Sequence, residues 1–526
     1  MKINKYFVIA GLYTASLSTT ISCKKTSFDE LYRDPSKVTE TTIDKQFTGI
    51  LFTYRELVIP TYRNYFVTLA PTIHRHIQTV GWQNADEQLT PGAAAIDDRW
   101  ERYYQGLAQF REFEKIYNAA PESEKNDKKI FYLAAKIFFY DMTQQQVDLH
   151  GDIPWSEAGK LSTNGGDYTI SYPKYDKATD IYTTMLDDLK AINSELTNIK
   201  VAPGILTGFQ NQDLVNSGSI DLWKKYCNSL RLRMLTRVGQ TQAFSARANQ
   251  EIADIIANAP LVLDNKDNIQ VDIFDVATDI NSKGFRDAIE SWNNNIAGKV
   301  MIDDMVAKAD PRLPYMFEPG PGAGGKYMGL DPALASAAQA ELLINTTQNP
   351  SKVTTYNRST YSRNQFFPGV LITASEVKFL IAEFKLRSGS DAAAKTAFEE
   401  GIKASIGMQQ NIRKVSNNNE VAAPTAPTGE QISKYISNVG WEGNKLQLIA
   451  MQKWLHFNII QSVENWSEVR RLNYPIFAFR VAPSDRQKTV PLRWTIGTSE
   501  LSNNSTNYEA VKAQDNVNTK IFWDVN

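Results

Sequence analysis

Apolar residues recur along this chain at the spacing of α-helices. Between residues 178 and 192 they fall at i, i+3, i+4, i+7, i+8, i+11 and i+14, which forms one continuous apolar stripe. A second stripe covers residues 130–138. Strand-like alternation is rare and short, so the pattern predicts an all-α chain. The helical segments expected are 42–58, 97–118, 128–148, 175–196, 219–238, 245–257, 298–308, 374–388, 391–407, 429–438 and 444–471.

Residues 374–407 give the clearest pair of helices. Gly389 is positioned to end the first helix, and Gly401 lies on the apolar stripe of the second, where two helices must approach closely. The unit resembles a tetratricopeptide repeat, a helix–turn–helix of about 34 residues. The segments 128–148 and 175–196 form a candidate second pair. Such pairs cannot bury their stripes alone, so we expect them to stack into a superhelical scaffold.

Long segments that are polar, aromatic and rich in Gly and Pro separate the helices. Loops beyond about 12–15 residues are usually functional or disordered. These segments contain many aromatic residues, which disordered segments generally lack. We therefore expect ordered loops that carry the binding chemistry. The segments are 60–96, 149–174, 259–297, 309–373 and 414–428.

The N-terminal segment has the pattern of a secretory signal peptide. Lys2 and Lys5 precede an apolar run at 6–17 that is too short to span a membrane. Cys23 follows, and its setting resembles the acylated cysteine of bacterial lipoproteins. The alternative is an ordinary secreted protein with an incidental cysteine. The parts expected are a signal peptide at 1–22, a lipidated tether at 23–40 and one α-helical domain at 41–526.

Composition narrows the function classes. The 526 residues carry a formal charge of −1 and no basic stripe, so we do not expect nucleic-acid binding. No second apolar stretch approaches membrane-spanning length, so attachment to a membrane would come through the lipid anchor alone. With Cys23 acylated, Cys227 has no disulfide partner. Its helical surroundings predict a small buried residue and not a catalytic thiol.

The chain offers no positive signal for catalysis. Its four histidines show no metal-ligand spacing, and His74 and His76 are expected on one side of a strand in a structural or surface role. The glycine-rich segment 320–325 lacks the flanking strand and helix of a nucleotide site and is expected to be a turn-rich loop. We expect no enzyme, no cofactor and no metal ion. Dispersed Asp and Glu residues leave an exported glycoside hydrolase as an alternative.

Three sequence segments, taken together, indicate a particular protein family more specifically than any one of them does alone. They are Gly151-Asp152-Ile153-Pro154, Asp310-Pro311-Arg312-Leu313 and the segment 466–475. With the lipoprotein-like start and the repeat-like helix pair, they resemble the SusD/RagB family of outer-membrane lipoproteins from Bacteroidetes over essentially the whole chain. The C-terminal residues of this pattern are Pro491, Glu500, Asn503, Asn507 and Phe522-Trp523-Asp524.

The resemblance implies a nutrient-capture protein. Members of that family are lipid-anchored at the outer membrane and face the cell exterior. They act as a lid on a SusC-like TonB-dependent transporter, to which they deliver an oligosaccharide or another nutrient without catalysis. The alternative from a different class is a repeat-type adaptor that binds only protein or peptide through the concave face of its stacked helices.

The family has no motif that fixes its ligand site, so the candidate residues come from the composition of the loops. Trp82 with Asn84, and Trp292 with Asn294, each place an indole beside amides within a long loop. Tyr327, next to the glycine-rich segment, is the third aromatic candidate. The alternative for both tryptophans is core packing, because Trp is highly buried on average. Core packing is the expected role of the tryptophans in helical patterns, Trp223, Trp454 and Trp466.

Overall fold

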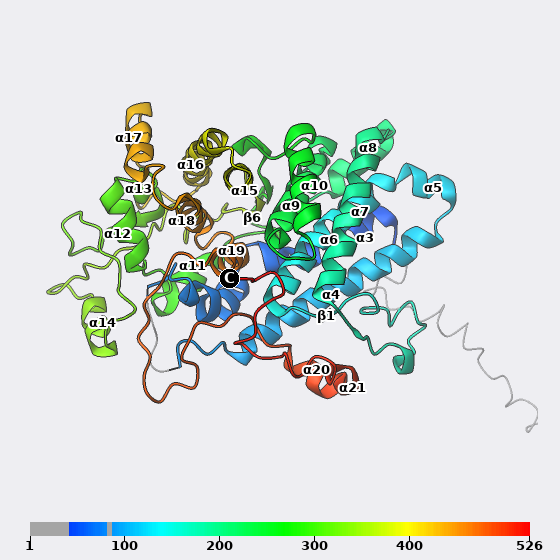
Figure 1. Cartoon of the computed structure of the whole chain (residues 1–526), viewed down its shortest axis with the longest axis horizontal. Helices are drawn as coiled ribbons and strands as arrows, with labels where there is room; N and C mark the ends of the chain where they lie inside the picture. Colours follow the sequence, from blue (N-terminus) through cyan, green and yellow to red (C-terminus); the bar gives the residue numbers. More distant parts are fainter. Residues whose placement is uncertain (1–40, 82–86) are drawn as a thin grey trace, which may run out of the picture. The chain divides into compact units, whose positions relative to one another are not determined.

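Helices form where the apolar stripes predict them (Figure 1). The computed structural model describes residues 41–81 and 87–526, in which Ile43–Asn526 form one compact unit. Cys23 and the predicted signal peptide and tether lie outside the described residues. The α-helices are α3 (Ile43–Val58), α4 (Ala93–Ala119), α5 (Glu122–Asp127), α6 (Lys129–His150), α7 (Ala178–Asn198), α8 (Pro203–Gln212), α9 (Ile220–Val238), α10 (Ser245–Asn258), α11 (Phe285–Glu290), α12 (Lys299–Lys308), α13 (Leu313–Met316), α14 (Ser336–Leu343), α15 (Ala374–Arg387), α16 (Asp391–Lys414), α17 (Gly429–Val439), α18 (Lys445–Phe457), α19 (Ser462–Leu472), α20 (Thr498–Asn503) and α21 (Ser505–Tyr508).

Strands are short and form only two-stranded sheets in the described part of the chain, which confirms the all-α fold class. Each pair is antiparallel: β1 with β2, β3 with β6, and β4 with β5. None of the helices described above combines the length and apolarity needed to cross a membrane. The strands and non-α helices are β1 (Ile153–Pro154), β2 (Tyr175–Asp176), β3 (Ile269–Val271), β4 (Phe317–Glu318), β5 (Thr355–Tyr356), β6 (Gly369–Ile372), the π-helix η1 (Arg63–His74) and the 3-10 helices η2 (Tyr168–Ile170), η3 (Asn265–Asp267) and η4 (Ser291–Asn293).

The predicted helix pair at 374–407 is present as α15 and α16. The side chain of Thr373 caps α15 by accepting a backbone hydrogen bond from the first turn. Gly389 allows the sharp turn between the helices with a φ of +78°. A Cβ on Gly401 of α16 would lie 2.6 Å from the Phe379 ring of α15, so the small residue permits the close approach of the two helices.

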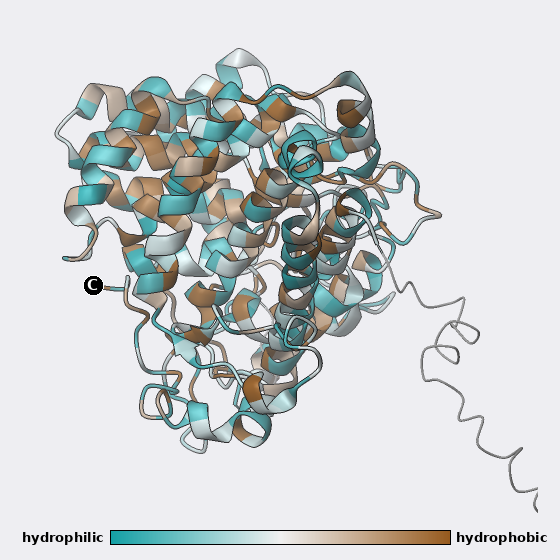
Figure 2. Cartoon of the chain, turned by 90° about the vertical axis from the view of Figure 1, so that its right-hand side faces the viewer, coloured by the Kyte–Doolittle hydropathy of each residue, from teal (hydrophilic) through white to brown (hydrophobic). Residues whose placement is uncertain are grey.

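The second predicted pair, α6 and α7, is antiparallel as well. Lys136 Nζ lies 2.6 Å from Asp188 Oδ2, and further along the pair the Tyr182 hydroxyl donates to Asp148 Oδ1 at 2.5 Å. Helix α9 packs against both α7 and α15 and so joins the two pairs. Figure 2 shows apolar residues gathered where the stacked helices face one another and polar residues on their outer sides. This stack is the superhelical scaffold that the apolar stripes predict.

Two large apolar clusters fill the unit. The first core cluster joins α3, α4, α6, α7, α9 and α10, and it contains Trp223 and Cys227. The second core cluster lies among η1, α11, α12, α18 and α19, and it contains Trp454 and Trp466. All three tryptophans are buried, which confirms their packing role. Burial raises the pKa of the Cys227 thiol to about 12, so this residue is an inert part of the core.

The segment 444–471 is wrong as a single predicted helix. The chain forms α18, turns at Asn458 with a φ of +42°, and begins α19 at Ser462. Asparagine tolerates the positive φ that ends many helices. Both helices pack on the second core cluster. The apolar pattern therefore continues across the break, and periodicity alone does not reveal it.

The segment 60–96, predicted to be a loop, contains the π-helix η1. Pro71 lies inside this helix, and a proline argues against a helix interior when only the sequence is known. Tyr65, Leu69 and Ile73, four residues apart, are all buried in the second core cluster. Their spacing is a helical signal that the proline conceals.

His74 and His76 lie in helical backbone, which corrects the predicted strand. Both are buried, and His74 Nε2 lies 2.7 Å from Ser462 Oγ. Their role is structural and not a surface role. Burial lowers the pKa of each of the four histidines to about 3, so all are neutral near pH 7: His74, His76, His150 and His456.

These buried histidines predict that the protein loses stability in mild acid. The pKa of each histidine is lower in the folded chain than the value of about 6.5 expected after unfolding, so the unfolded chain takes up protons first. The free energy of unfolding is therefore greatest above pH 6.5 and falls below it, by up to about 1.4 kcal/mol per pH unit for each histidine. Urea denaturation at pH 7.5 and pH 5.5 measures the change. Equal stability at the two values would contradict the neutral, buried state.

A buried network of charges joins α15, α18 and α19. Arg471 Nη2 lies 2.6 Å from both Glu383 Oε2 and Glu468 Oε2. Lys453 Nζ lies 2.9 Å from Glu383 and 2.7 Å from Glu468. Burial alone would raise the pKa of Glu383, but the charges of Arg471 and Lys453 outweigh it and hold the pKa well below its usual range. The network therefore holds the α15–α16 pair to α18 and α19.

Candidate functional site

Four loop segments meet beside the second core cluster. The backbone N–H of Gly81 donates to the carbonyl oxygen of Ile296 at 2.9 Å. The next residue, Ala297, makes two more such bonds. Its carbonyl oxygen accepts from the N–H of Leu330 at 2.9 Å, and its own N–H donates to the carbonyl oxygen of Thr354 at 3.0 Å. The first of these bonds joins residues more than 200 positions apart in the chain, and the other two join residues more than 30 positions apart. We name the four segments, 78–81, 291–299, 326–330 and 353–356, the loop junction.

Glycines let the backbones of the loop junction approach closely. A Cβ on Gly81 would lie 2.7 Å from the carbonyl oxygen of Ala297. A Cβ on Gly329 would lie 2.6 Å from the Cα atom of Lys299. Both distances are too short for a real side chain, and the atoms met are backbone atoms that cannot swing away. The junction is therefore a tightly packed platform and not a set of independent loops.

We predict that Gly81→Ala destabilises the protein by about 1–3 kcal/mol, because an added methyl group must displace packed backbone. Urea denaturation measures the loss. Gly204→Ala is the matched control, since a Cβ at Gly204 of α8 meets no atom within 4 Å. If the two variants are equally stable, the close packing of the loop junction is wrong.

Trp292 projects from the loop junction into solvent. Its side chain is 71% exposed, so the alternative of core packing does not apply to it. Trp292 has a φ of 55° and Asn293 a φ of 60°, so two consecutive residues occupy the left-handed region without glycine. Such backbone strain persists only where the surroundings impose it, and it concentrates at functional positions. The strained turn presents an indole that the fold does not need for packing.

Polar side chains lie directly before this turn. Glu290 accepts a hydrogen bond from Arg363 Nε at 2.9 Å and another from the Ser362 hydroxyl at 2.6 Å. Burial alone would raise the pKa of Glu290, but these partners outweigh it and lower the pKa below its usual range. A fixed, ionised carboxylate and its donors therefore lie two residues before the exposed indole in the chain.

The other predicted site residues are placed differently. Asn294 is only 4% exposed, and its Nδ2 lies 3.5 Å from the carbonyl oxygen of Ala288. Its amide lies beneath the surface, under the turn that carries Trp292, so it does not share the exposed face with the indole. Tyr327 is half-buried against the second core cluster, and burial, with a smaller effect from Glu318, raises the pKa of its hydroxyl.

Trp82 and Asn84 lie outside the described residues. Gly81, which directly precedes Trp82 in the sequence, is bonded to Ile296 within the loop junction. The chain segments that contain Trp292 and Tyr327 belong to the same junction. Two regions chosen separately from the sequence, those of Trp292 and Tyr327, are thus connected with Gly81 in one hydrogen-bonded platform, although the sequence alone does not indicate their contact.

A family model described as "Starch-binding associating with outer membrane" matches residues 74–496. The chain belongs to the SusD-like family. Members of this family are generally binding proteins associated with the outer membrane and with nutrient uptake. None of the curated proteins matches the chain.

Solved structures share the fold of this SusD-like chain. A protein named as a chitin-binding protein is 21% identical, with a TM-score of 0.74 over 91% of this chain and 100% of its own. A SusD homolog from Parabacteroides distasonis is 19% identical, with a TM-score of 0.72 over 92% and 98%. A SusD homolog from Bacteroides fragilis is 19% identical, with a TM-score of 0.71 over 92% and 100%. At these identities the similarity shows the fold.

The segments that carry the family resemblance lie in the SusD-like scaffold. Gly151, with a φ of +80°, ends α6. Arg312 is buried and its Nη2 lies 2.6 Å from Asp310 Oδ2, while its Nη1 donates to Ser405 at 2.9 Å. Arg470 donates to the backbone oxygen of Asp148 at 2.9 Å. These residues hold helices together, so none of them is a candidate for ligand contact.

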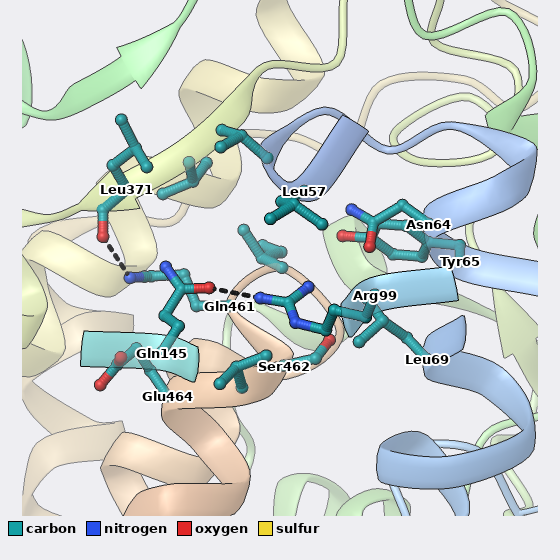
Figure 3. Close-up of a pocket in the computed structure, with 14 residues that line it drawn as sticks. Leu57, Asn64, Tyr65, Leu69, Arg99, Gln145, Leu371, Gln461, Ser462 and Glu464 are labelled. Carbon is teal, nitrogen blue, oxygen red and sulfur yellow. Dashed lines mark hydrogen bonds between the residues drawn. The ribbon is translucent and has the colours of Figure 1, made fainter. Parts of the chain in front are cut away.

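A small cavity lies among α3, η1, α4, α6, β6 and the start of α19 (Figure 3). Its volume is about 40 Å³, which holds a few water molecules and is far smaller than a site for a sugar or drug-sized ligand. Arg99 donates to Gln145 at 2.8 Å, and Gln461 donates to the carbonyl oxygen of Leu371 at 2.9 Å. Arg99 Nε and Gln461 Oε1 point to no protein partner. The polar lining suits structural water, and we do not assign a ligand to it.

No group of three His, Cys, Asp or Glu side chains in the described ranges has a geometry that could hold a metal ion. The glycine-rich segment 320–325 is turn and loop, as predicted. The exposed face of the loop junction, centred on Trp292, is therefore the candidate functional site of this SusD-like chain.

Proposed function

We propose that this chain captures neutral oligosaccharides on the exposed face of the loop junction and does not turn them over. The observation that carries the proposal is the 71% exposed Trp292 on a strained, rigidly held turn. The apolar C–H face of a pyranose ring stacks on an indole, whose ring face is electron-rich. Fixed polar groups such as Glu290 and Arg363 suit the ring hydroxyls. Trp82, Asn84 and Tyr327 remain proposed members of the site, and Asn294 supports it from below.

We further propose that the protein acts as a lid on an outer-membrane transporter. The sequence from Lys2 to Cys23 favours export and acylation of Cys23, which would leave the helical unit tethered by lipid and facing the cell exterior. A SusC-like TonB-dependent transporter is the proposed partner that receives the oligosaccharide. Family membership supports this arrangement, because the family is associated with the outer membrane and nutrient binding.

Affinity electrophoresis with soluble starch and with glycol chitin tests the binding function, and product analysis of the same mixtures tests the absence of turnover. The two polymers follow from the family description and from the name of one structural relative. We expect retardation by at least one polymer with no shortened product. Release of oligosaccharides would favour the exported glycoside hydrolase, and retardation by neither polymer would contradict the proposal.

We predict that Cys23→Ala releases a folded, saccharide-competent protein that no longer supports uptake. A single acyl chain holds a protein only marginally at a membrane, so the multi-chain acylation of a lipoprotein is needed for firm anchoring. Cell fractionation and growth on the polysaccharide measure the two effects. Normal growth with the variant still in the outer membrane would overturn the tether.

A further inference from the structure

A groove whose side chains suit a saccharide lies away from the loop junction. It is formed by the segment after β3, the residues before β6 and the C-terminal end of α16, and it encloses a volume of about 340 Å³. That volume lies within the usual range for small-molecule sites. The groove shares no lining residue with the loop junction.

The most exposed aromatic ring of the described residues stands in this groove. Phe274 is 76% exposed, slightly more than Trp292, and Phe366 is a half-buried neighbour in the lining. Phe274 therefore contributes little to the core, and its removal leaves no cavity. Phe274 is not a lone exposed ring, because Ile273, Phe366 and Pro368 line the same groove, and contiguous apolar patches of this kind mark binding surfaces.

Amide and carboxylate groups line the same groove. Gln270 Nε2 donates to Asp272 Oδ1 at 2.6 Å, which fixes both side chains at the edge of β3. Asn265 Nδ2 donates to the carbonyl oxygen of Ala404 at 2.9 Å, but its buried Oδ1 has no protein partner. Asn411 of α16 also lines the groove. Desolvation by the surrounding protein raises the pKa of Asp272 above its usual value, although the residue is exposed at the groove.

Polar contacts connect the groove with the loop junction. Glu290, two residues before Trp292, pairs with Arg363 at 2.9 Å. Asn417 Nδ2 donates to Gln365 Oε1 at 3.0 Å, directly before Phe366 in the sequence. Both contacts are made by residues 363–366, so one short stretch of chain connects the surroundings of Trp292 with the groove.

We propose that this groove is a second saccharide-binding site, in which a neutral pyranose unit stacks on Phe274 while its hydroxyls bond to Asn411 and to the Gln270–Asp272 pair. This inference rests on the proposed function. An aromatic ring among fixed amides suits a sugar, whose apolar faces and hydroxyl edges alternate around the ring. The apolar part of the lining also includes Ile273, Pro368, Met408, Ile412 and Val415, and the amides with the Asp272 carboxylate beside it favour a sugar over a purely apolar partner.

Affinity electrophoresis of single and double variants in soluble starch and in glycol chitin tests the second site. Two sites that engage one polymer gain avidity, so losing either weakens polymer binding by about tenfold to a hundredfold without abolishing it. We expect this weakening from Phe274→Ala and from Asn411→Ala, and the same from Trp292→Ala. The double variant Trp292→Ala/Phe274→Ala should not be retarded at all. Tyr168→Ala, which truncates a 67% exposed aromatic ring on another loop, is the matched control.

The outcomes separate the two proposals. If Phe274→Ala and Asn411→Ala bind the polymer as well as Tyr168→Ala does, the second site is wrong, whereas the proposed site at the loop junction is unaffected. Complete loss of binding in Trp292→Ala alone also overturns the second site. Loss in Phe274→Ala with none in Trp292→Ala overturns the loop junction and supports the groove. No retardation of the wild type by either polymer overturns both. Thermal unfolding of each variant confirms that it is folded.

Discussion

Replacing Trp292 by alanine should weaken binding of the protein to its polysaccharide by about thirtyfold while leaving the fold intact. A tryptophan at the centre of a binding surface commonly contributes about 2 kcal/mol or more, which corresponds to that factor. The 71% exposed indole makes little contact with the core, so we expect stability to change by less than about 0.5 kcal/mol. Affinity electrophoresis and urea denaturation measure the two quantities.

Trp292→Gly sharpens this prediction. Glycine adopts the observed φ of 55° without the steric penalty that a left-handed L-residue carries, about 1 kcal/mol. We therefore expect Trp292→Gly to be as stable as the wild type or more so, and still to bind the polysaccharide about thirtyfold more weakly. Weak binding caused by a disrupted fold would instead appear as lower stability. Retained binding in both variants would remove Trp292 from the site.

Replacing Glu383 by glutamine should lower the free energy of unfolding by about 3–5 kcal/mol, because it leaves the charges of Arg471 and Lys453 buried with one carboxylate fewer. The change keeps the shape of the side chain and removes only its charge. Arg471 Nη2 and Lys453 Nζ lie 2.6 and 2.9 Å from the Glu383 carboxylate. Urea denaturation near pH 7.5 measures the effect.

Glu400→Gln is the control for this substitution. Glu400 pairs with Lys378 at 2.7 Å on the same α15–α16 pair, but its side chain is about half exposed. Surface ion pairs typically contribute less than about 1 kcal/mol, so little change is expected. Similar losses for both glutamines would show that the buried network does not hold α15 to α18 and α19.

The helical scaffold follows from local patterns in the sequence. Apolar stripes predict the positions of α7 and the other long helices, and Gly389 with Gly401 predicts the α15–α16 pair. The misplaced elements have definite physical causes. The turn at Asn458 interrupts no apolar pattern, since α18 and α19 share one core cluster. Pro71 conceals the helical spacing of the residues in η1.

The candidate site is only partly predictable from the sequence. Indoles beside amides in long loops point to Trp292, and the structure exposes it. Asn294, chosen by the same reasoning, is buried, because neighbouring residues of a tight turn face in different directions. The loop junction rests on backbone hydrogen bonds between distant segments, and these leave no periodic signal. Gly81, Gly298 and Gly329 are the trace that the junction leaves in the sequence, and the reason why these positions need glycine is evident only from the structure.

The groove at Phe274 is missed for a related reason. Its residues come from three separate segments, and no short motif contains both an aromatic ring and the Asn411 amide. Phe274 lies in the segment 259–297, which the sequence marks as a binding loop without selecting this residue. Its exposure and its place in one groove with Asn411 distinguish it, and both are known only from the structure.

The most direct test of the proposed function is a crystal structure of the protein with bound maltohexaose or chitohexaose. We expect a sugar ring stacked on the indole of Trp292, with its hydroxyls directed toward Glu290 and Arg363. A hexasaccharide that is ordered elsewhere on the protein, with no contact to the loop junction, would contradict the account.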